Sequence, residues 1–133
     1  NSPGGSVYAG LGIYDTMQLI TCPVHTVSVW LSASMGSIIL CWWEKWKRFS
    51  LPHSEIMIHQ PLWWTEWQAA DIKIAAENII KTWETLYKIL AKHSWKTLKQ
   101  VEKDCDRNNF MTAEQALEYW LIDKIIVNKK DIK

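Results

Sequence analysis

Two small hydroxyl residues, Ser32 and Ser34, lie between an apolar stretch at residues 27–31 and a second one at residues 38–40. A strand that turns directly into a helix leaves a side chain exposed at the turn, above unpaired N–H groups and the positive end of the helix dipole. A nucleophilic serine needs this exposure and backbone donors for the oxyanion that its attack creates. The pattern therefore predicts a candidate nucleophile at one of the two serines, although a helix start packed on a sheet has the same pattern.

A serine nucleophile needs a general base and a third group that orients the base. His59 follows the apolar run at residues 56–58, which places it at the C-terminal end of a buried strand. Open α/β sheets hold their sites at such strand ends, so His59 is the candidate base, although a structural role would also explain it. The remaining histidines lie in polar, turn-like stretches and are predicted to be surface residues: His25, His53 and His93.

Length and composition exclude several functional classes. The 133 residues suffice for a single domain, 1–133, with its own core, and a net charge of +1 does not indicate binding to nucleic acid or to an anionic membrane. Three cysteines without metal-ligand spacing, and no signal peptide, indicate a reducing cytosol and no metal site. Residues 16–43 lack charged side chains, but Pro23 and several serines interrupt them, which favours a buried strand–turn–helix over a membrane helix.

Alternating strand and helix patterns predict an α/β fold with parallel strands. Helices are expected at residues 7–20, 34–43 and 69–92, and after the capping boxes that begin at Thr97 and Thr112. Strands are expected at residues 25–31, 49–51, 55–58 and 122–127, with a polar loop at 104–110 and a frayed tail at 128–133. The long helix at 69–92 has one charged face, so it is either a plain surface helix or an arm used for assembly.

Seven short motifs stand in order along the chain: Asn1–Gly5, Ile13–Met17, Ala33–Gly36, Lys47–Pro52, Met57–Pro61, Asp106–Met111 and Ala113–Ala116. Together they closely resemble the proteolytic subunits of Clp proteases, the ClpP family, from residue 1 to about residue 127. The resemblance implies a crotonase-like ββα superhelix whose protruding handle helix corresponds to residues 69–92. It also implies a cytoplasmic homo-oligomer of two stacked seven-membered rings, fed with unfolded proteins and peptides by a AAA+ ATPase, without a metal or organic cofactor.

The resemblance also assigns roles to individual residues. By position, Ser34 is the nucleophile, His59 is the general base, and Gly5 and Met35 supply the N–H groups of the oxyanion hole. Ser32 is then not the nucleophile, a choice that the residues alone leave open. The other positions that correspond to family sites are Ser6, Leu62 and Trp63 along the substrate strand, Asp106 and Arg107 at the ring–ring contact, and Phe49 and Leu51 in the groove for the ATPase.

The triad acid of the family falls on Asn108 in this chain. A neutral amide can accept the imidazole N–H and hold the ring, but it cannot stabilise imidazolium with a full charge. This departure favours an alternative, in which the chain is a weakly active or non-catalytic subunit of a mixed ring. A crotonase-type acyl-CoA enzyme would share the fold, but it would not need Ser34 and His59 in these motifs. The chain also begins at Asn1, without the N-terminal portion of the family, and is expected to be a fragment.

The high tryptophan content also departs from the family pattern: the chain has ten tryptophans and only five glycines. The family pattern has glycine at eight of the tryptophans, or at nine if a Gly-or-Ala position is included, and not at Trp83. Those nine are Trp30, Trp42, Trp43, Trp46, Trp63, Trp64, Trp67, Trp95 and Trp120. We expect that they are UGA codons that the source organism reads as glycine; the alternative is a genuine Trp-rich paralogue.

Overall fold

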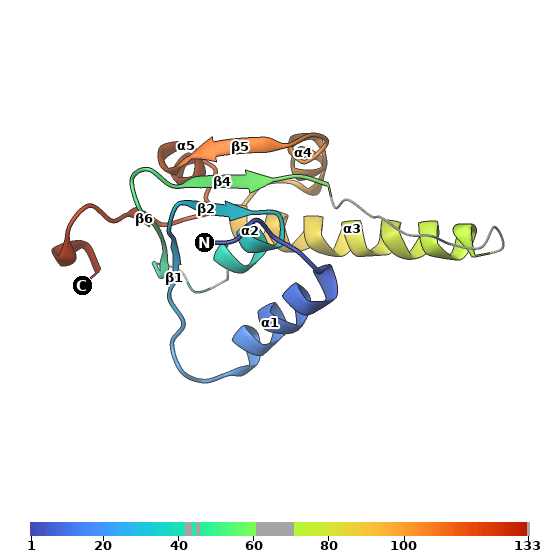
Figure 1. The fold of residues 1–133 in the computed structure, drawn as a ribbon, viewed down its shortest axis with the longest axis horizontal. Coiled ribbons are helices and arrows are strands. Elements are labelled where there is room, and N and C mark those ends of the chain that lie inside the picture. Colours follow the sequence, from blue (N-terminus) through green and yellow to red (C-terminus); the bar gives the residue numbers. More distant parts are fainter. Residues whose placement is uncertain (42–43, 45, 61–70, 133) are drawn as a thin grey trace.

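The computed structural model describes residues 1–41, 44, 46–60 and 71–132. Its helices are α1 (Val7–Leu19), α2 (Met35–Leu40), α3 (Ile72–Ser94), α4 (Leu98–Asp104) and α5 (Ala113–Glu118), followed by the short 3₁₀ helix η1 (Lys129–Ile132). Its strands are β1 (Thr26–Ser28), β2 (Leu31–Ala33), β3 (Arg48–Ser50), β4 (Glu55–Ile58), β5 (Asn109–Thr112) and β6 (Lys124–Ile125) (Figure 1).

The strands form two three-stranded sheets, which confirms the predicted α/β fold. One sheet has the order β1-β3-β6 with both pairings parallel. The other has the order β2-β4-β5, in which β2 is parallel to β4 and β5 is antiparallel to it. The apolar run of β4 is buried at all three positions, as expected for a strand that is covered on both faces.

Three predicted elements differ from the structure. Residues 25–31 are two strands in different sheets, because the backbone at Trp30 has φ 78° and turns the chain between them. The expected loop at 104–110 ends early, because β5 begins at Asn109 and pairs with β4. At the C-terminal end only β6 is a strand, and the expected frayed tail contains η1, where the Asp131 carboxylate accepts the N–H groups of Val127 and Asn128.

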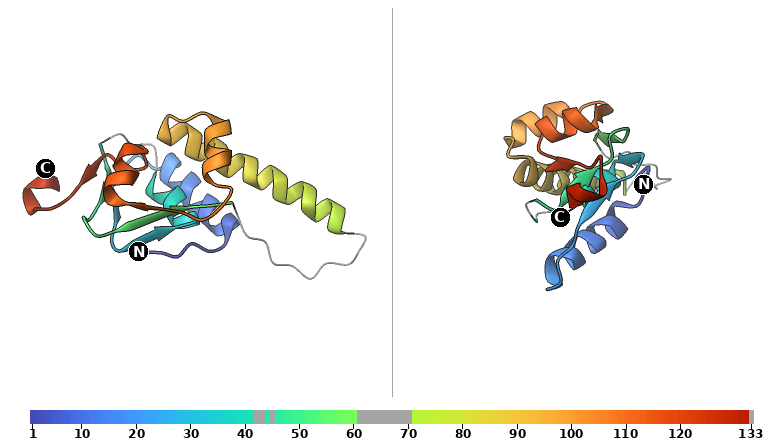
Figure 2. Two further views of the ribbon diagram at one scale, coloured as in Figure 1. Left: turned by 90° about the horizontal axis from the view of Figure 1, so that it is seen from above. Right: turned by 90° about the vertical axis from the view of Figure 1, so that its left-hand side faces the viewer.

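Helix α3 joins the core at one end and projects at the other. Leu86, Tyr87 and Leu90 belong to the core cluster, together with residues of α1, α2, β4 and α4. The N-terminal half extends past both sheets (Figures 1 and 2), and Ile72 and Ile74 there are 57% and 67% exposed. In the part of the chain that the structure describes, no helix combines the length and apolar character needed to cross a membrane.

His93, near the end of α3, is buried, so the prediction of a surface histidine is wrong at this position. It is 4% exposed, and its Nε2 lies 2.6 Å from the hydroxyl of Tyr14 on α1. Burial raises the pKa of Tyr14 to about 12, and which of the two groups donates in this hydrogen bond depends on the tautomer of the imidazole. This contact could not be predicted from local sequence patterns, because the two residues lie 79 positions apart.

A buried ion pair ties three segments together beside this contact. The Arg48 side chain makes a bidentate pair with Asp123, with Nη2 2.6 Å and Nε 3.0 Å from the carboxylate oxygens. Its Nη1 also donates to the backbone carbonyls of His93 and Trp120, at 3.0 and 2.9 Å. The guanidinium therefore links β3 with the end of α3 and with the turn after α5.

Candidate active site

Ser34 lies at the sharp turn between β2 and α2. Its backbone has φ 54° and ψ −122°, and its N–H donates to the carbonyl of Met57 at 2.9 Å. Its own carbonyl accepts the N–H groups of Ser37 and Ile38, while its hydroxyl does not cap the helix. A positive φ at a serine is a strained conformation that occurs preferentially at functional sites. The turn therefore presents the Ser34 hydroxyl in the manner of a nucleophile elbow.

Ser32, the other candidate from the sequence, lies in a different environment. Its side chain is 5% exposed, and its Oγ is 2.8 Å from Oγ of Ser28 inside the sheet layer. A buried hydroxyl that is already hydrogen-bonded is poorly placed to attack a substrate. Of the two serines, the geometry favours Ser34.

His59 comes to the same edge as Ser34 through strand pairing. Strands β2 and β4 run parallel, with Ala33 opposite Met57, so the residues that follow both strands lie at one end of the sheet. Ser34 and His59 line a common pocket whose apolar wall includes Ile58, Leu86 and Leu90. No hydrogen bond joins the two side chains within the described residues; such contacts are often long in unliganded enzymes and tighten when substrate binds.

Asn108 lies beside His59 because β5 runs antiparallel to β4. Ile58 pairs with Asn109, so the next residues outward along the two strands face each other. The His59 Nδ1 is 3.0 Å from the Asn108 Oδ1. If Nδ1 donates its proton to this amide oxygen, Nε2 keeps a free lone pair, which is the tautomer that a general base requires.

Gln60 forms hydrogen bonds between the end of β4 and the loop before β5. Its N–H donates to the carbonyl of Cys105 at 2.6 Å, and its Nε2 donates to the carbonyl of Asp106 at 3.2 Å. The loop that carries Asn108 is thereby tied to the end of the strand that carries His59.

The loop at Gly4 and Gly5 passes directly over Ser34. Gly4 has φ 97°, and a Cβ there would lie 2.6 Å from Ser34 Cβ and 2.9 Å from the Ala33 carbonyl oxygen. Only glycine permits this approach, and the predicted oxyanion-hole residue Gly5, with φ 147°, follows Gly4 directly in the chain. Met35, the second predicted donor, is the first residue of α2, where a helix leaves its N–H groups without intrahelical partners.

Ser2 positions this glycine loop, a role that the sequence reasoning missed. Its backbone N–H donates to the Leu31 carbonyl at 2.8 Å, and its carbonyl accepts the N–H of Ala33 at 2.9 Å. Its Oγ accepts the N–H of Gly4 at 3.1 Å. A serine two residues before a glycine, with a proline between them, is typical of a serine turn, and this pattern could have identified the role of Ser2 from the sequence.

The remaining predicted site residues are distributed over the surface and the core. Ser6 caps α1, with its Oγ accepting the N–H of Ala9. Asp106 and Arg107 are both highly exposed, and the Arg107 Nε lies 3.7 Å from the Asp106 Oδ2. Phe49 is only 6% exposed and stacks obliquely near His25, whereas Leu51 is partly exposed. Leu62 and Trp63 lie outside the described residues.

Two of the three thiols are unsuited to nucleophilic chemistry. Cys41 and Cys105 are fully buried, and burial raises the pKa of each thiol to about 12. Cys22 is exposed. Over residues 1–41, 44, 46–60 and 71–132, no group of three His, Cys, Asp or Glu side chains could hold a metal ion.

A family model and two similar proteins from other organisms all point to the same protein family. The model of the Clp protease family matches residues 1–129. An "ATP-dependent Clp protease proteolytic subunit" of Porphyromonas gingivalis is 56% identical over 126 residues, which are 95% of this chain and 57% of that protein. A protein of the same name from Ligilactobacillus salivarius is 52% identical over 133 residues, which are 100% of this chain and 68% of that protein.

Proposed function

The chain belongs to the Clp protease family, and from this premise we propose that it is a serine endopeptidase subunit of an ATP-dependent Clp protease. The observation that carries the proposal is the elbow at Ser34, with the Gly4–Gly5 backbone over it and His59 at the same end of the sheet. The chain spans 57% and 68% of the two relatives, so the activity proposed is that of the full-length protein.

In the proposed reaction, Nε2 of His59 removes the proton from Oγ of Ser34 as this oxygen attacks the peptide carbonyl carbon. The N–H groups of Gly5 and Met35 donate to the oxyanion of the tetrahedral intermediate. The imidazolium then gives its proton to the leaving amine, and an acyl-enzyme remains on Ser34. His59 next deprotonates a water molecule, which hydrolyses the ester and restores the serine. Asn108 holds the His59 ring through Nδ1 in each step.

The quaternary part of the proposal concerns the projecting half of α3 and the exposed pair Asp106 and Arg107. Two stacked seven-membered rings would use these features as ring–ring contacts, with a AAA+ ATPase delivering unfolded chains in the cytoplasm. Ile72 and Ile74 on the free part of α3 are exposed apolar side chains that a neighbouring subunit would cover.

A second candidate function is a weakly active or non-catalytic subunit of a mixed ring. Asn108 favours it, because an amide cannot stabilise the imidazolium as a carboxylate does. In a non-catalytic subunit Ser34 would form no covalent intermediate, and in a weakly active subunit it would form one slowly.

A fluorophosphonate probe, which reacts with activated serines, separates them on the full-length protein. We expect labelling of the native protein, loss of labelling in Ser34→Ala, and retained labelling in Ser32→Ala. Absence of labelling in a correctly assembled native protein would support the non-catalytic subunit instead. Labelling that survives Ser34→Ala would show that the nucleophile lies elsewhere.

A further inference from the structure

Four of the five tryptophans that the structure describes have a left-handed backbone. The φ angles are 78° at Trp30, 69° at Trp46, 58° at Trp95 and 69° at Trp120. Among the described non-glycine residues, Ser34 is the only other one with a positive φ. Only a few per cent of non-glycine residues adopt this conformation, and a bulky side chain there is an outlier.

The surrounding elements explain why the chain turns left-handed at three of these positions. Trp95 is the C-cap of α3, with φ 58° and ψ 20°, where helices commonly end on glycine. Trp30 separates β1 from β2, which belong to different sheets. Trp120 follows α5, and its carbonyl accepts from Arg48 at 2.9 Å, so the fold requires its backbone in this place. The conformation is thus imposed by the elements on either side.

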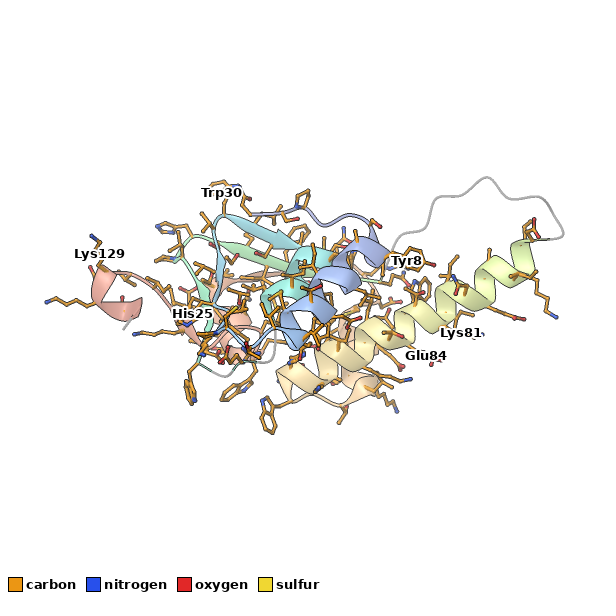
Figure 3. The ribbon with its side chains drawn as sticks, turned by 90° about the horizontal axis from the view of Figure 1, so that it is seen from below. Tyr8, His25, Trp30, Lys81, Glu84 and Lys129 are labelled. Atoms are coloured by element: carbon orange, nitrogen blue, oxygen red, sulfur yellow. The ribbon has the colours of Figure 1, made fainter. Side chains whose placement is uncertain are left out.

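The side chains at these four positions lie largely or half in solvent. Trp30, Trp46, Trp95 and Trp120 are 72%, 73%, 67% and 49% exposed, although tryptophan is highly buried on average. Figure 3 shows Trp30 at the outer edge of the molecule, directed away from the ribbon. None of the four rings belongs to the core cluster, and glycine at these positions would relieve the steric cost of a Cβ at positive φ.

Trp83 has the opposite character and serves as an internal comparison. It lies in the interior of α3, is partly buried, and packs against the core cluster. Glycine there would lose this packing and would weaken the helix. Among the described tryptophans, Trp83 therefore has an environment that suits tryptophan, and the other four have a backbone conformation that suits glycine.

We infer that residues 30, 46, 95 and 120 are glycine in the protein that its source organism makes, encoded by UGA read as glycine, and that Trp83 is tryptophan. The backbone angles support the inference independently of the resemblance to the family. The same inference would apply to Trp63 and Trp64, which lie outside the described residues.

The coding DNA and the mass of the native protein test the inference directly. We expect UGA codons at positions 30, 46, 95 and 120 and UGG at position 83, with tryptic peptides from the native protein carrying the mass of glycine at the four positions. UGG codons at the four positions, or tryptophan in those peptides, would overturn it.

The physical basis is tested in an ordinary host on the full-length protein. The variant with Trp30→Gly, Trp46→Gly, Trp95→Gly and Trp120→Gly should unfold at a higher urea concentration than the protein with tryptophan at all four positions. The matched control Trp83→Gly should unfold at a lower concentration. A fall in the midpoint of the four-glycine variant as large as that of Trp83→Gly would overturn the assignment of these positions to glycine.

Discussion

The imidazole of His59 and the amide of Asn108 face each other across the antiparallel pair β4–β5, with Nδ1 3.0 Å from Oδ1. The separation matches a hydrogen bond, so the ring is oriented without a carboxylate. The neutral amide offers the ring one acceptor oxygen and an N–H donor group, and it offers the imidazolium no full charge.

We expect Asn108→Asp to raise kcat for hydrolysis of a fluorogenic peptide by the full-length protein. A carboxylate would stabilise the imidazolium that forms as Ser34 loses its proton, and the reverse change in a Ser-His-Asp protease costs about 10⁴ in kcat, which bounds the gain. The double variant Ser34→Ala with Asn108→Asp should remain inactive. An unchanged or lower kcat would mean that the charge at this position does not limit the rate.

We expect Ser2→Ala to lower kcat by about 2- to 10-fold with little change in KM, since one hydrogen bond is worth about 0.5–1.5 kcal/mol. The lost bond is the one from the Gly4 N–H to Ser2 Oγ, so the glycine loop over Ser34 would be less firmly placed when the oxyanion forms. Ser2→Thr keeps a hydroxyl and should restore most of the rate. Equal losses in both variants would speak against a positioning role.

Breaking the buried ion pair between Arg48 and Asp123 should destabilise the fold. Asp123→Asn leaves the guanidinium charge buried and unpaired, which typically costs about 3–5 kcal/mol in the free energy of unfolding. The control is Glu84→Gln, which breaks the exposed pair with Lys88 and should cost under about 0.5 kcal/mol. Urea unfolding at pH 7 measures both, and losses of similar size would contradict the importance of burial.

His93 should make stability depend on pH in the acidic range. Burial, with the charges of Lys92 and Arg48 acting in the same direction, lowers the pKa of His93 from 6.5 to about 4. The unfolded chain therefore binds a proton between pH 6.5 and pH 4 that the folded chain does not. Its contribution to stability is complete above pH 6.5 and is lost as the pH falls toward 4, by up to about 3 kcal/mol.

The measurement is the urea midpoint at pH 7 and at pH 5 for three proteins. His93→Gln keeps a hydrogen-bonding group for the Tyr14 hydroxyl but does not titrate, so its midpoint should fall less on acidification than that of the native protein. His53→Gln, at an exposed histidine, should behave as the native protein does. A native-like acid dependence in His93→Gln would assign the effect to other groups.

The sequence predicted well those features that depend on apolar periodicity and on where a buried strand ends. The apolar run of β4 is unambiguous, and its C-terminal end placed His59 beside the turn at Ser34. The break at Trp30 could not be predicted from the apolar pattern, because it depends on one backbone angle. Strand β5 was missed because Asn109–Thr112 is short, with only Met111 buried, and becomes a strand only by pairing with β4. Positions of core contacts such as Tyr14 with His93 depend on the tertiary fold.

Trp83 would be a single fluorescent probe if all nine other tryptophans are glycine in the native protein. It would then be the only indole in the chain, and its Nε1 is buried without a hydrogen-bond partner in the described structure. An indole in such a dry setting fluoresces at shorter wavelength than one in water. The emission spectrum of the glycine form would then report on a single place, the middle of α3, and its shift to longer wavelength would follow the moment at which this helix separates from the core.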